Sequence, residues 1–545
     1  MDGRLVAKKK AQLVFLVSLV LMIISPSFSD ASSVGAEAQV QKWDYLALGD
    51  SLAHGLQYDG KDGLSYADYI ADHLTDLDRL KQFNKSYARS GLTTSEMLAM
   101  LQTNVDLQLA IANTDLITLS VGANDLLEVL KKDPNGLNDP AVAGAILTKA
   151  GNNYAQIMAG IRKLNPDASI FLMGYYNSFY AYPKEQQDAV AYVMKELNKG
   201  IESIATASGS GFVPTYEAIA ENYQAYLPNP LDVHPSQAGY QAIASEFWKQ
   251  MKPTLPIGIE RIAGKDRYLT AVAISKASFE AADTVVLARG DDFPDALSGA
   301  PLAYKKNAPI LLTGETLPLA VKDEINRLGA HHAIVLGGTG AVSDYVVNEL
   351  KGLGLKTKRL GGKDRFETAA HIAAYLDGNP PKAVVANGMD FPDALSIASY
   401  AAKQGYPILL TQQNTLPTIT ETALVEFESS IIVGGKGVVS EKVAGQLPAP
   451  VRYGGANRYA TSAEIAMKLT PADKAVVATG ANFADALTGS ILAARSESTF
   501  LLVPPMKMDE SIQKAAIEIG IRNFTILGGE GAVNQEVITS LQKIK

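Results

Sequence analysis

Short apolar runs alternate with longer amphipathic segments in residues 43–251 of this 545-residue chain. The apolar runs predict buried strands, and the segments with apolar residues at helical spacing predict helices between them. The expected strands are Tyr45–Leu48, Leu116–Val121, Ser169–Met173 and Gly211–Val213, and the expected helices are Ser65–Leu74, Ala141–Lys163, Lys184–Ala207 and Ser236–Gln250. Strands separated by helices of this length pair in parallel, which predicts a doubly wound, flavodoxin-like α/β domain.

The second half of the chain contains three copies of one pattern. Three landmarks recur in the same order. They are Asp266-Arg267-Tyr268, Asp364-Arg365-Phe366 and Asn457-Arg458-Tyr459; then Phe293–Leu297, Phe391–Leu395 and Phe483–Leu487; then Leu336–Gly338, Val433–Gly435 and Leu527–Gly529. The first copy predicts strands at Thr284–Ala288, Pro309–Thr313 and Ala333–Leu336, with helices at Thr270–Phe279, Pro294–Tyr304 and Pro318–Leu328. Each copy therefore predicts a small α/β module.

Pro/Gly-rich segments and the repeat spacing set the expected domain boundaries. These are 1–29 for a secretion signal, 30–42 for a spacer, 43–251 for the first domain, 252–259 for a linker, and 260–356, 357–449 and 450–545 for the repeats.

The first 29 residues predict a cleaved secretion signal. Four basic residues among the first ten precede the stretch Leu13–Ile24, which is apolar except for Ser18. That stretch is shorter than the ~20 residues that span a bilayer. Ser27 and Ser29 suit a signal peptidase, Ala36 and Ala38 offer a second site, and an uncleaved anchor is the alternative. No other segment is apolar for long enough, so we expect no transmembrane anchor after cleavage.

Composition and charge exclude several classes of function. Hydrophobic residues make up 47% of the chain and no cysteine is present, which excludes disorder, disulfides and a thiol nucleophile. The net charge of −8 argues against nucleic-acid binding. Residues 260–545 hold 29 basic and 30 acidic residues, so an anionic polymer would have to bind there through local clusters. No metal-ligand pattern is present in the sequence, and we expect neither metal nor cofactor.

Four short motifs follow predicted strands or lie next to predicted helices in the first domain. They are Gly49-Asp50-Ser51-Leu52, Ser90-Gly91-Leu92, Gly122-Ala123-Asn124-Asp125 and Asp232-Val233-His234-Pro235. A serine hydroxyl needs a base to take its proton, and amide groups stabilise an oxyanion. We expect Asp50 and Asp125 to hold their loops through side-chain to backbone bonds, and His54 to be structural.

The order Ser, Gly, Asn, then Asp and His resembles that of the SGNH, or GDSL, serine hydrolases. The resemblance implies Ser51 as nucleophile, His234 as general base and acid, and an oxyanion hole made by Ser51, Gly91 and Asn124. Asp232 would orient His234. The family usually places this aspartate three residues before the histidine, where this chain has Leu231. The resemblance therefore leaves two possibilities, a triad with Asp232 or a dyad supported by backbone groups.

The repeats resemble the type 2 cell-wall-binding repeats of Gram-positive surface proteins. The resemblance rests on D-R-[YF] with a threonine three residues after the arginine, on F-x-D-A-L and on the double-glycine turn. It implies three modules arranged as a pseudo-trimer that hold an anionic wall polymer. Arg267, Arg365 and Arg458 are candidate polymer contacts, with an ion pair to the adjoining acidic residue as the alternative. Asp295, Asp393 and Asp485 are expected to cap helices. The third copy departs at Asn457 and Ala484, which would make it the weakest if both boxes bind polymer.

Together these patterns predict a secreted serine esterase or lipase, held in the cell wall of a Gram-positive bacterium. Its substrate would be an acyl ester, either a lipid or an acylated glycan. Tyr175, Tyr176, Phe179, Tyr180 and Tyr182 offer an apolar wall for an acyl chain, or simply pack beside the core. The alternatives are a carbohydrate O-deacetylase acting on wall glycans and a non-catalytic wall-binding adhesin.

Overall fold

The computed structural model describes residues 40–544, so the expected secretion signal and most of the spacer lie outside the described residues. The N-terminal domain contains one five-stranded parallel sheet in the order β2-β1-β3-β4-β5. The strands are β1 (Trp43–Gly49), β2 (Leu80–Asn84), β3 (Leu116–Ser120), β4 (Ser169–Met173) and β5 (Gly211–Val213). This confirms the doubly wound α/β fold, with one strand, β2, that the sequence reading missed.

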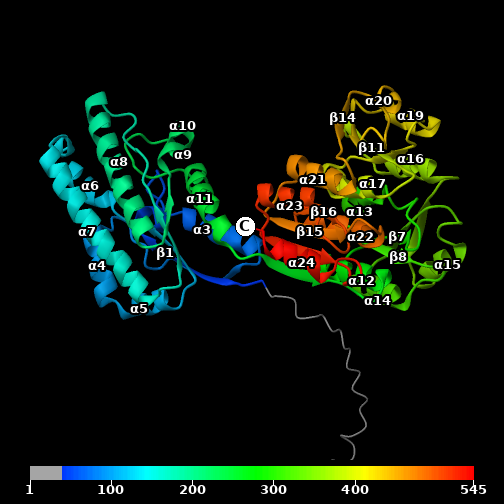
Figure 1. Cartoon of the computed structure of the whole chain (residues 1–545), viewed down its shortest axis with the longest axis horizontal. Helices are drawn as coiled ribbons and strands as arrows, with labels where there is room; N and C mark the ends of the chain where they lie inside the picture. The colour runs from blue at the N-terminus through cyan, green and yellow to red at the C-terminus, as the bar shows by residue number, and fades with distance from the viewer. Residues whose placement is uncertain (1–39, 545) are drawn as a thin grey trace, which may run out of the picture. The chain divides into compact units, whose positions relative to one another are not determined.

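Helices cover both faces of this sheet (Figure 1). On one face α4 and α8 pack against α7, and on the other α3 packs against α11. The helices are α2 (Ser51–His54), α3 (Tyr66–Asp76), α4 (Thr94–Thr103), α5 (Val105–Ala112), α6 (Ala123–Lys132), α7 (Pro140–Leu164), α8 (Lys184–Ala207), α9 (Tyr216–Ala220), α10 (Tyr223–Tyr226) and α11 (Gln237–Met251), with short 3₁₀ turns η1 (Gly136–Asn138) and η2 (Lys252–Thr254).

Local sequence explains where these helices begin. Ser65 and Thr93 form capping boxes with Asp68 and Glu96, in which each side chain satisfies a free amide of the other end of the turn. The strands β1, β3 and β4 are almost continuously apolar, because helices cover both of their faces. Their side chains form one buried cluster with the inner faces of the helices.

Each repeat contributes to a four-stranded parallel sheet. The sheets, in spatial order, are β10 (Lys356–Leu360), β9 (His332–Leu336), β7 (Thr284–Arg289), β8 (Ile310–Thr313); β12 (Ile408–Thr411), β11 (Lys382–Asn387), β13 (Ser429–Val433), β14 (Pro450–Tyr453); and β16 (Thr499–Val503), β15 (Lys474–Thr479), β17 (Asn523–Leu527), β6 (Gly258–Ile262). The helices are α12 (Arg267–Ser278), α13 (Gly299–Lys305), α14 (Leu319–Leu328), α15 (Asp344–Gly352), α16 (Arg365–Tyr375), α17 (Pro392–Ser396), α18 (Ala398–Gln404), α19 (Thr418–Leu424), α20 (Glu441–Ala444), α21 (Arg458–Leu469), α22 (Ala484–Arg495), α23 (Glu510–Ile519) and α24 (Gln535–Gln542).

The sheets are offset by one strand from the sequence repeats. The strand that precedes the D-R-[YF] motif of the second copy, β10, pairs with β9 of the first copy, and β14 likewise pairs with β13. The strand that precedes the first copy, β6, pairs with β17 of the third, along the register Gly258–Ile262 against Asn523–Leu527. The first strand of the array therefore completes its last sheet.

Buried residues of all three copies belong to one hydrophobic cluster. One phenylalanine ring from each copy meets the others here: the centroids of Phe293, Phe391 and Phe483 lie 5.6, 6.1 and 6.4 Å apart. Helices α13, α18 and α22 contact one another. The exact pseudo-trimer relation implied by the family stays a prediction, but the three copies share one core.

The F-x-D-A-L segment forms a different helix in each copy. The expected helix Pro294–Tyr304 begins only at Gly299, and the second copy divides into α17 and α18. In the third copy, which has Ala484 in place of proline, α22 is continuous over 12 residues. Alanine has the highest helix propensity, whereas proline has no amide to donate.

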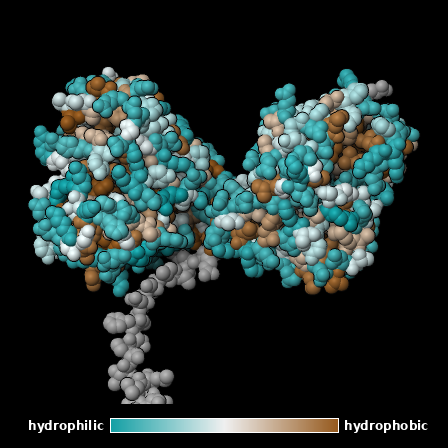
Figure 2. Space-filling model, turned by 180° about the vertical axis from the view of Figure 1, so that it is seen from behind, coloured by the Kyte–Doolittle hydropathy of each residue, from teal (hydrophilic) through white to brown (hydrophobic). Residues whose placement is uncertain are grey.

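The surface seen in Figure 2 is largely hydrophilic with scattered hydrophobic residues. Within residues 40–544, no helix has the combination of length and apolar character that crossing a bilayer requires.

Candidate functional site

The turn after β1 presents Ser51 at the carboxyl end of the sheet. Gly49 has φ +141°, and a side chain there would collide with the Ser120 backbone, so the turn requires glycine. Asp50 caps α2 by accepting a hydrogen bond from the Leu52 amide at 3.0 Å. Ser51 is thereby the first residue of a short helix whose start is fixed by a side chain.

The Asp50 carboxylate is buried beneath this turn. Ser120 donates to it at 3.0 Å and the Tyr175 hydroxyl donates at 2.5 Å, so three donors satisfy it. Burial raises the pKa of Asp50 to about 6, although these hydrogen bonds act in the opposite direction. The structural role expected for Asp50 is confirmed; its partner Tyr175, from the segment after β4, was not foreseen.

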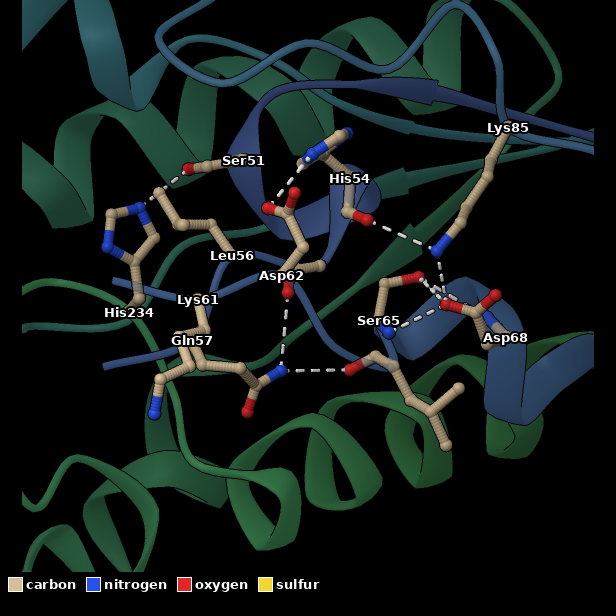
Figure 3. Close-up of polar contacts among 12 residues, drawn as sticks. Ser51, His54, Leu56, Gln57, Lys61, Asp62, Ser65, Asp68, Lys85 and His234 are labelled. Carbon is tan, nitrogen blue, oxygen red and sulfur yellow. Dashed lines mark hydrogen bonds and ion pairs between the residues drawn. The ribbon is translucent and has the colours of Figure 1, made fainter. Parts of the chain in front are cut away.

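Three side chains form a continuous hydrogen-bonded chain at this end of the sheet. The Ser51 hydroxyl lies 2.9 Å from Nε2 of His234, and Nδ1 of His234 lies 2.5 Å from Oδ1 of Asp232 (Figure 3 shows the first contact). The carboxylate fixes the tautomer with hydrogen on Nδ1, which leaves Nε2 free to accept the serine proton. This is the arrangement by which a histidine activates a serine hydroxyl.

The irregular spacing of the aspartate does not prevent its contact with the imidazole. Oδ1 of Asp232 also accepts a hydrogen bond from the His234 backbone amide at 2.8 Å, so the chain turns back on itself within two residues. Leu231, at the usual position of the acid, is 84% exposed. Of the two possibilities left by the sequence, the geometry favours the one with Asp232 beside the histidine.

His54 takes no part in this chain. Its Nε2 pairs with Asp62 at 3.1 Å, and its backbone oxygen accepts a hydrogen bond from Lys85, as Figure 3 shows. Lys85 also contacts Asp68, the capping residue of α3. His54 therefore belongs to a network that holds the loop after Ser51, in agreement with the structural role expected for it.

Two of the three candidate oxyanion residues, Gly91 and Asn124, lie near the starts of α4 and α6, which Asp125 joins. Asn124 lies at the start of α6 and donates to the Leu92 carbonyl at 3.1 Å. Asp125 accepts from the Thr94 amide at 2.9 Å and from its hydroxyl at 2.6 Å, which joins the starts of α6 and α4. The loop-holding role expected for Asp125 is confirmed. Gly91 lies in the exposed turn just before α4.

A pocket opens beside Ser51. Its lining contains Ser51, Asn124 and, from the expected aromatic wall, Tyr175, Tyr176 and Phe179. The two remaining residues of that wall lie elsewhere: Tyr180 stacks on Tyr223 and Tyr182 packs against Phe179. In residues 40–544 no group of three or more carboxylate or imidazole side chains is arranged to hold a metal ion.

The arginines of the repeats hold the ends of the central strands. Arg267, Arg365 and Arg458 each donate through Nη1 to the carbonyl of the glycine that follows the central strand, at Gly290, Gly388 and Gly480. The acidic residues before them cap helices, since Asp266 accepts from the Leu269 amide and Asp364 from the Glu367 amide. Among the described residues, neither Arg267 nor Arg365 forms an ion pair with the aspartate before it, so the geometry does not support that alternative.

Two of these arginines also contact the preceding repeat. The guanidinium groups of Arg365 and Arg458 lie 5.6 Å from the ring centroids of Phe293 and Phe391, respectively. Arg458 also pairs with Asp390 at 3.1 Å. The arginines thus link successive repeats.

The aspartates of the F-x-D-A-L boxes lie against the double-glycine turns. Gly337, Gly434 and Gly528 all have positive φ, and a Cβ on any of them would collide with Asp295, Asp393 or Asp485, respectively. Burial raises the pKa of Asp393 and of Asp485 to about 6. The expected capping role is wrong for Asp393 and Asp485, because α17 and α22 have no side-chain cap. These carboxylates instead lie against the glycine turns at the ends of neighbouring strands.

The third copy keeps its cap despite its altered motif. Asn457 accepts hydrogen bonds from the Tyr459 and Ala460 amides at 2.9 and 2.8 Å, as Asp364 does for the corresponding amides of α16. An amide oxygen replaces a carboxylate oxygen without loss of geometry.

Comparison with known proteins assigns both halves of the chain. Residues 47–242 match the model of the GDSL-like lipase/acylhydrolase family, and residues 261–347, 359–444 and 452–538 match cell wall binding domain 2. The chain is 36% identical over 288 residues to the N-acetylmuramoyl-L-alanine amidase LytC of Bacillus subtilis, covering 52% of this chain and 58% of the amidase. It is 26% identical over 212 residues to the spore germination lipase LipC of Bacillus licheniformis, covering 37% of this chain and 93% of the lipase.

Among solved structures, Cwp6 from Clostridium difficile superposes with a TM-score of 0.50 at 28% identity, covering 53% of this chain and 48% of that protein. The chain therefore spans little more than half the length of the amidase and about half of Cwp6. It combines one domain of the GDSL-like lipase/acylhydrolase family with three copies of cell wall binding domain 2.

Proposed function

We propose that the chain is a secreted, wall-associated serine esterase that hydrolyses acyl esters through an acyl-enzyme intermediate. The observation that carries the proposal is the hydrogen-bonded chain from Ser51 through His234 to Asp232, with Ser51 in the wall of a pocket. The family match of the domain supports a hydrolase.

In the first half-reaction, Ser51 Oγ attacks the ester carbonyl carbon while His234 Nε2 takes the hydroxyl proton. The carbonyl oxygen becomes an oxyanion, which the Ser51 and Gly91 amides and the Asn124 side chain would stabilise. His234 then gives its proton to the leaving alkoxide oxygen. The ester C–O bond breaks, an alcohol leaves and the acyl group stays on Ser51.

In the second half-reaction, a water molecule takes the place of the alcohol. His234 accepts one of its protons, the water oxygen attacks the acyl carbon, and the proton returns to Ser51 Oγ as a carboxylic acid leaves. Asp232 stabilises the imidazolium in both halves by accepting from Nδ1. No group besides water and the ester is consumed.

Turnover of p-nitrophenyl acetate, butyrate and octanoate by the protein, measured beside its Ser51→Ala variant, tests this function. We expect the protein to release p-nitrophenolate and the variant to release none above background. Equal rates for the two would overturn the proposal, since a surface-catalysed hydrolysis does not depend on Ser51.

Retention in the wall is the second part of the proposal. The three cell wall binding matches support it, and export follows from it because the wall lies outside the cytoplasmic membrane of a Gram-positive cell. The array is nearly neutral overall, so an anionic polymer would be bound by local donors. We include Arg267 and Arg365 among them, since their Nη1 groups hold the strand ends and other N–H groups of the same guanidinium can donate to a polymer. Arg458 would be a weaker donor, because its Nη2 group also pairs with Asp390.

Cosedimentation of the full chain with isolated Gram-positive walls tests this part. We expect binding to intact walls and much weaker binding to walls stripped of their anionic polymers. A chain truncated after residue 256 should keep esterase activity and stay in solution. Sedimentation of the truncated chain with walls would contradict an anchoring role for the repeats.

A further inference from the structure

The lining of the pocket beside Ser51 is mainly apolar. Asp50, Ser51, Asn124 and Ser178 are its small polar residues. The hydroxyl groups of Tyr175 and Tyr176 are already bonded to Asp50 and to the Val233 carbonyl. The rest of the lining is apolar or aromatic, and much of it comes from α6, η1 and α8. A polar group placed deep in such a pocket would lose its water without gaining a partner, whereas a hydrocarbon chain would gain burial.

Two helices, α6 and α8, supply rows of aliphatic side chains to the lining. Leu126 and Leu130 lie four residues apart on α6, and Val190 and Met194 lie four residues apart on α8. Residues at this spacing share one face of a helix, and they follow each other by ~6 Å along the axis. Leu137 of η1 completes the apolar lining. Leu126, Leu137, Val190 and Met194 are all buried, so the fold holds these lining side chains in place.

We propose that this pocket is the acyl subsite and that it selects unbranched acyl chains longer than butyryl, with Leu130 and Val190 as determinants of chain length. The proposal rests on the proposed esterase function and names its substrate class. An acetyl group would reach only the part near Ser51 and Asn124, and would leave the aliphatic rows uncovered. Lipid-like esters therefore fit this site better than the O-acetyl groups of wall glycans.

The full-length protein and p-nitrophenyl esters of increasing chain length test this subsite. Each methylene buried in an apolar site is worth roughly fourfold in kcat/KM. We therefore expect kcat/KM for the octanoate to exceed that for the acetate by at least tenfold. A flat or acetate-favouring profile would overturn the acyl-subsite proposal and leave the serine esterase function standing.

Filling the pocket supplies the second test. Leu130→Trp on α6 and Val190→Phe on α8 place larger side chains against the proposed acyl chain from two different helices. We expect the octanoate-to-acetate ratio of kcat/KM to fall at least tenfold in each variant. Leu130 is only partly buried, so its replacement is tolerated by the fold, and the second variant covers the case in which the first does not fold.

A matched control is Leu109→Trp, the same substitution on α5 at a side chain that is 56% exposed and does not line the pocket. It should leave the ratio within about twofold of the original protein. An unchanged ratio in both pocket variants would overturn the subsite. If no ester is hydrolysed and an alkyl fluorophosphonate fails to label Ser51, the esterase function itself fails, and the subsite falls with it.

Discussion

The N-terminal domain and the repeats place aspartates at the same point of a parallel sheet, yet put them to different use. Asp50 follows β1 and bonds to Ser120 at the end of the neighbouring strand β3. Asp393 follows β11 and lies against Gly434 at the end of the neighbouring strand β13. Burial raises the pKa of both carboxyl groups to about 6.

The difference lies in what surrounds each carboxylate. After Asp50 comes Ser51, which faces an imidazole and a pocket. Around Asp393 lie a neighbouring repeat, the ring of Phe391 and the guanidinium of Arg458. The carboxyl edge of a parallel sheet collects polar groups in either case. Chemistry requires, in addition, a nucleophile, a base and space for substrate, and only the N-terminal edge combines them among the residues described.

The largest expected effect comes from removing the nucleophile or the base, which should abolish catalysis in the N-terminal domain and leave the repeats unaffected. Ser51→Ala or His234→Ala should lower kcat by a factor on the order of 10⁶, since each is part of one proton-transfer unit. Wall binding and the thermal unfolding midpoint should not change. Ser86→Ala, at an exposed serine of the same domain, is the control. A loss of wall binding in the Ser51 variant would show that the two regions do not act independently.

Asp232 should contribute less to turnover than Ser51 or His234. Asp232→Asn should lower kcat by about 10³–10⁴, because the imidazole loses its charged partner but keeps its contact with Ser51. Steady-state kinetics beside His234→Ala decides the matter. Losses of equal size in both variants would make Asp232 as important as the base, despite its irregular spacing.

In the array, a change in β6 should affect stability alone. Ile259 is 1% exposed and lies in the core of the third sheet, so Ile259→Ala should lower the free energy of unfolding of the array by about 3 kcal/mol. Urea unfolding measures this, and esterase kcat/KM in the absence of urea should stay the same. Ile517→Ala, at a side chain 46% exposed on α23, is the matched control. Equal effects of the two would mean that β6 is dispensable to the third sheet.

The buried carboxyl groups of the array should make its stability depend on pH. The pKa of Asp393 is raised from 3.8 to about 6 in the folded array, so the folded state binds this proton more tightly than the unfolded chain. The contribution of protonated Asp393 to the stability of the array is therefore complete below pH 4, and it is lost as the pH rises through about 6.

Asp393→Asn removes that titration. As the pH rises from 4 to 8, the original protein should lose up to about 3 kcal/mol of unfolding free energy that the Asp393→Asn variant does not lose. Urea unfolding at both pH values measures the difference. Asp485→Asn should behave in the same direction, since burial raises that pKa to about 6 as well. A pH-independent difference between variant and original would contradict the raised pKa.

The elements that the sequence predicted and those that it missed differ in their burial. The strands β3, β4, β7 and β8 are mainly apolar and buried, and were predicted almost to the residue. The strands β2, β6, β10 and β14 were missed, and all four lie at the edge of a sheet. These four strands alternate exposed or half-buried positions with few buried ones, and they contain the charged residues Lys81, Arg261, Lys356 and Arg452. The edge strand β8 was predicted because all four of its residues are buried.

Some residues of the candidate site could be predicted from the sequence and others could not. Ser51 and His234 could be proposed because each stands in a short motif in a fixed order along the chain. The contact of Tyr175 with Asp50 spans 125 residues and leaves no local pattern. The leucine row of α6 was missed because that helix was not assigned, and a periodic apolar face reveals a pocket only when the facing helix is known.

The pairing of β6 with β17 also bears on the order in which the chain can fold as it is made. The hydrogen bond between Glu260 and Thr525 joins residues 265 positions apart. Synthesis proceeds from the N-terminus at ~5–20 residues per second. The first strand of the array must therefore stay unpaired for on the order of 10–50 s while the later copies emerge. Throughout that interval its exposed edge invites pairing with other chains, which makes the last sheet the most vulnerable step in assembly.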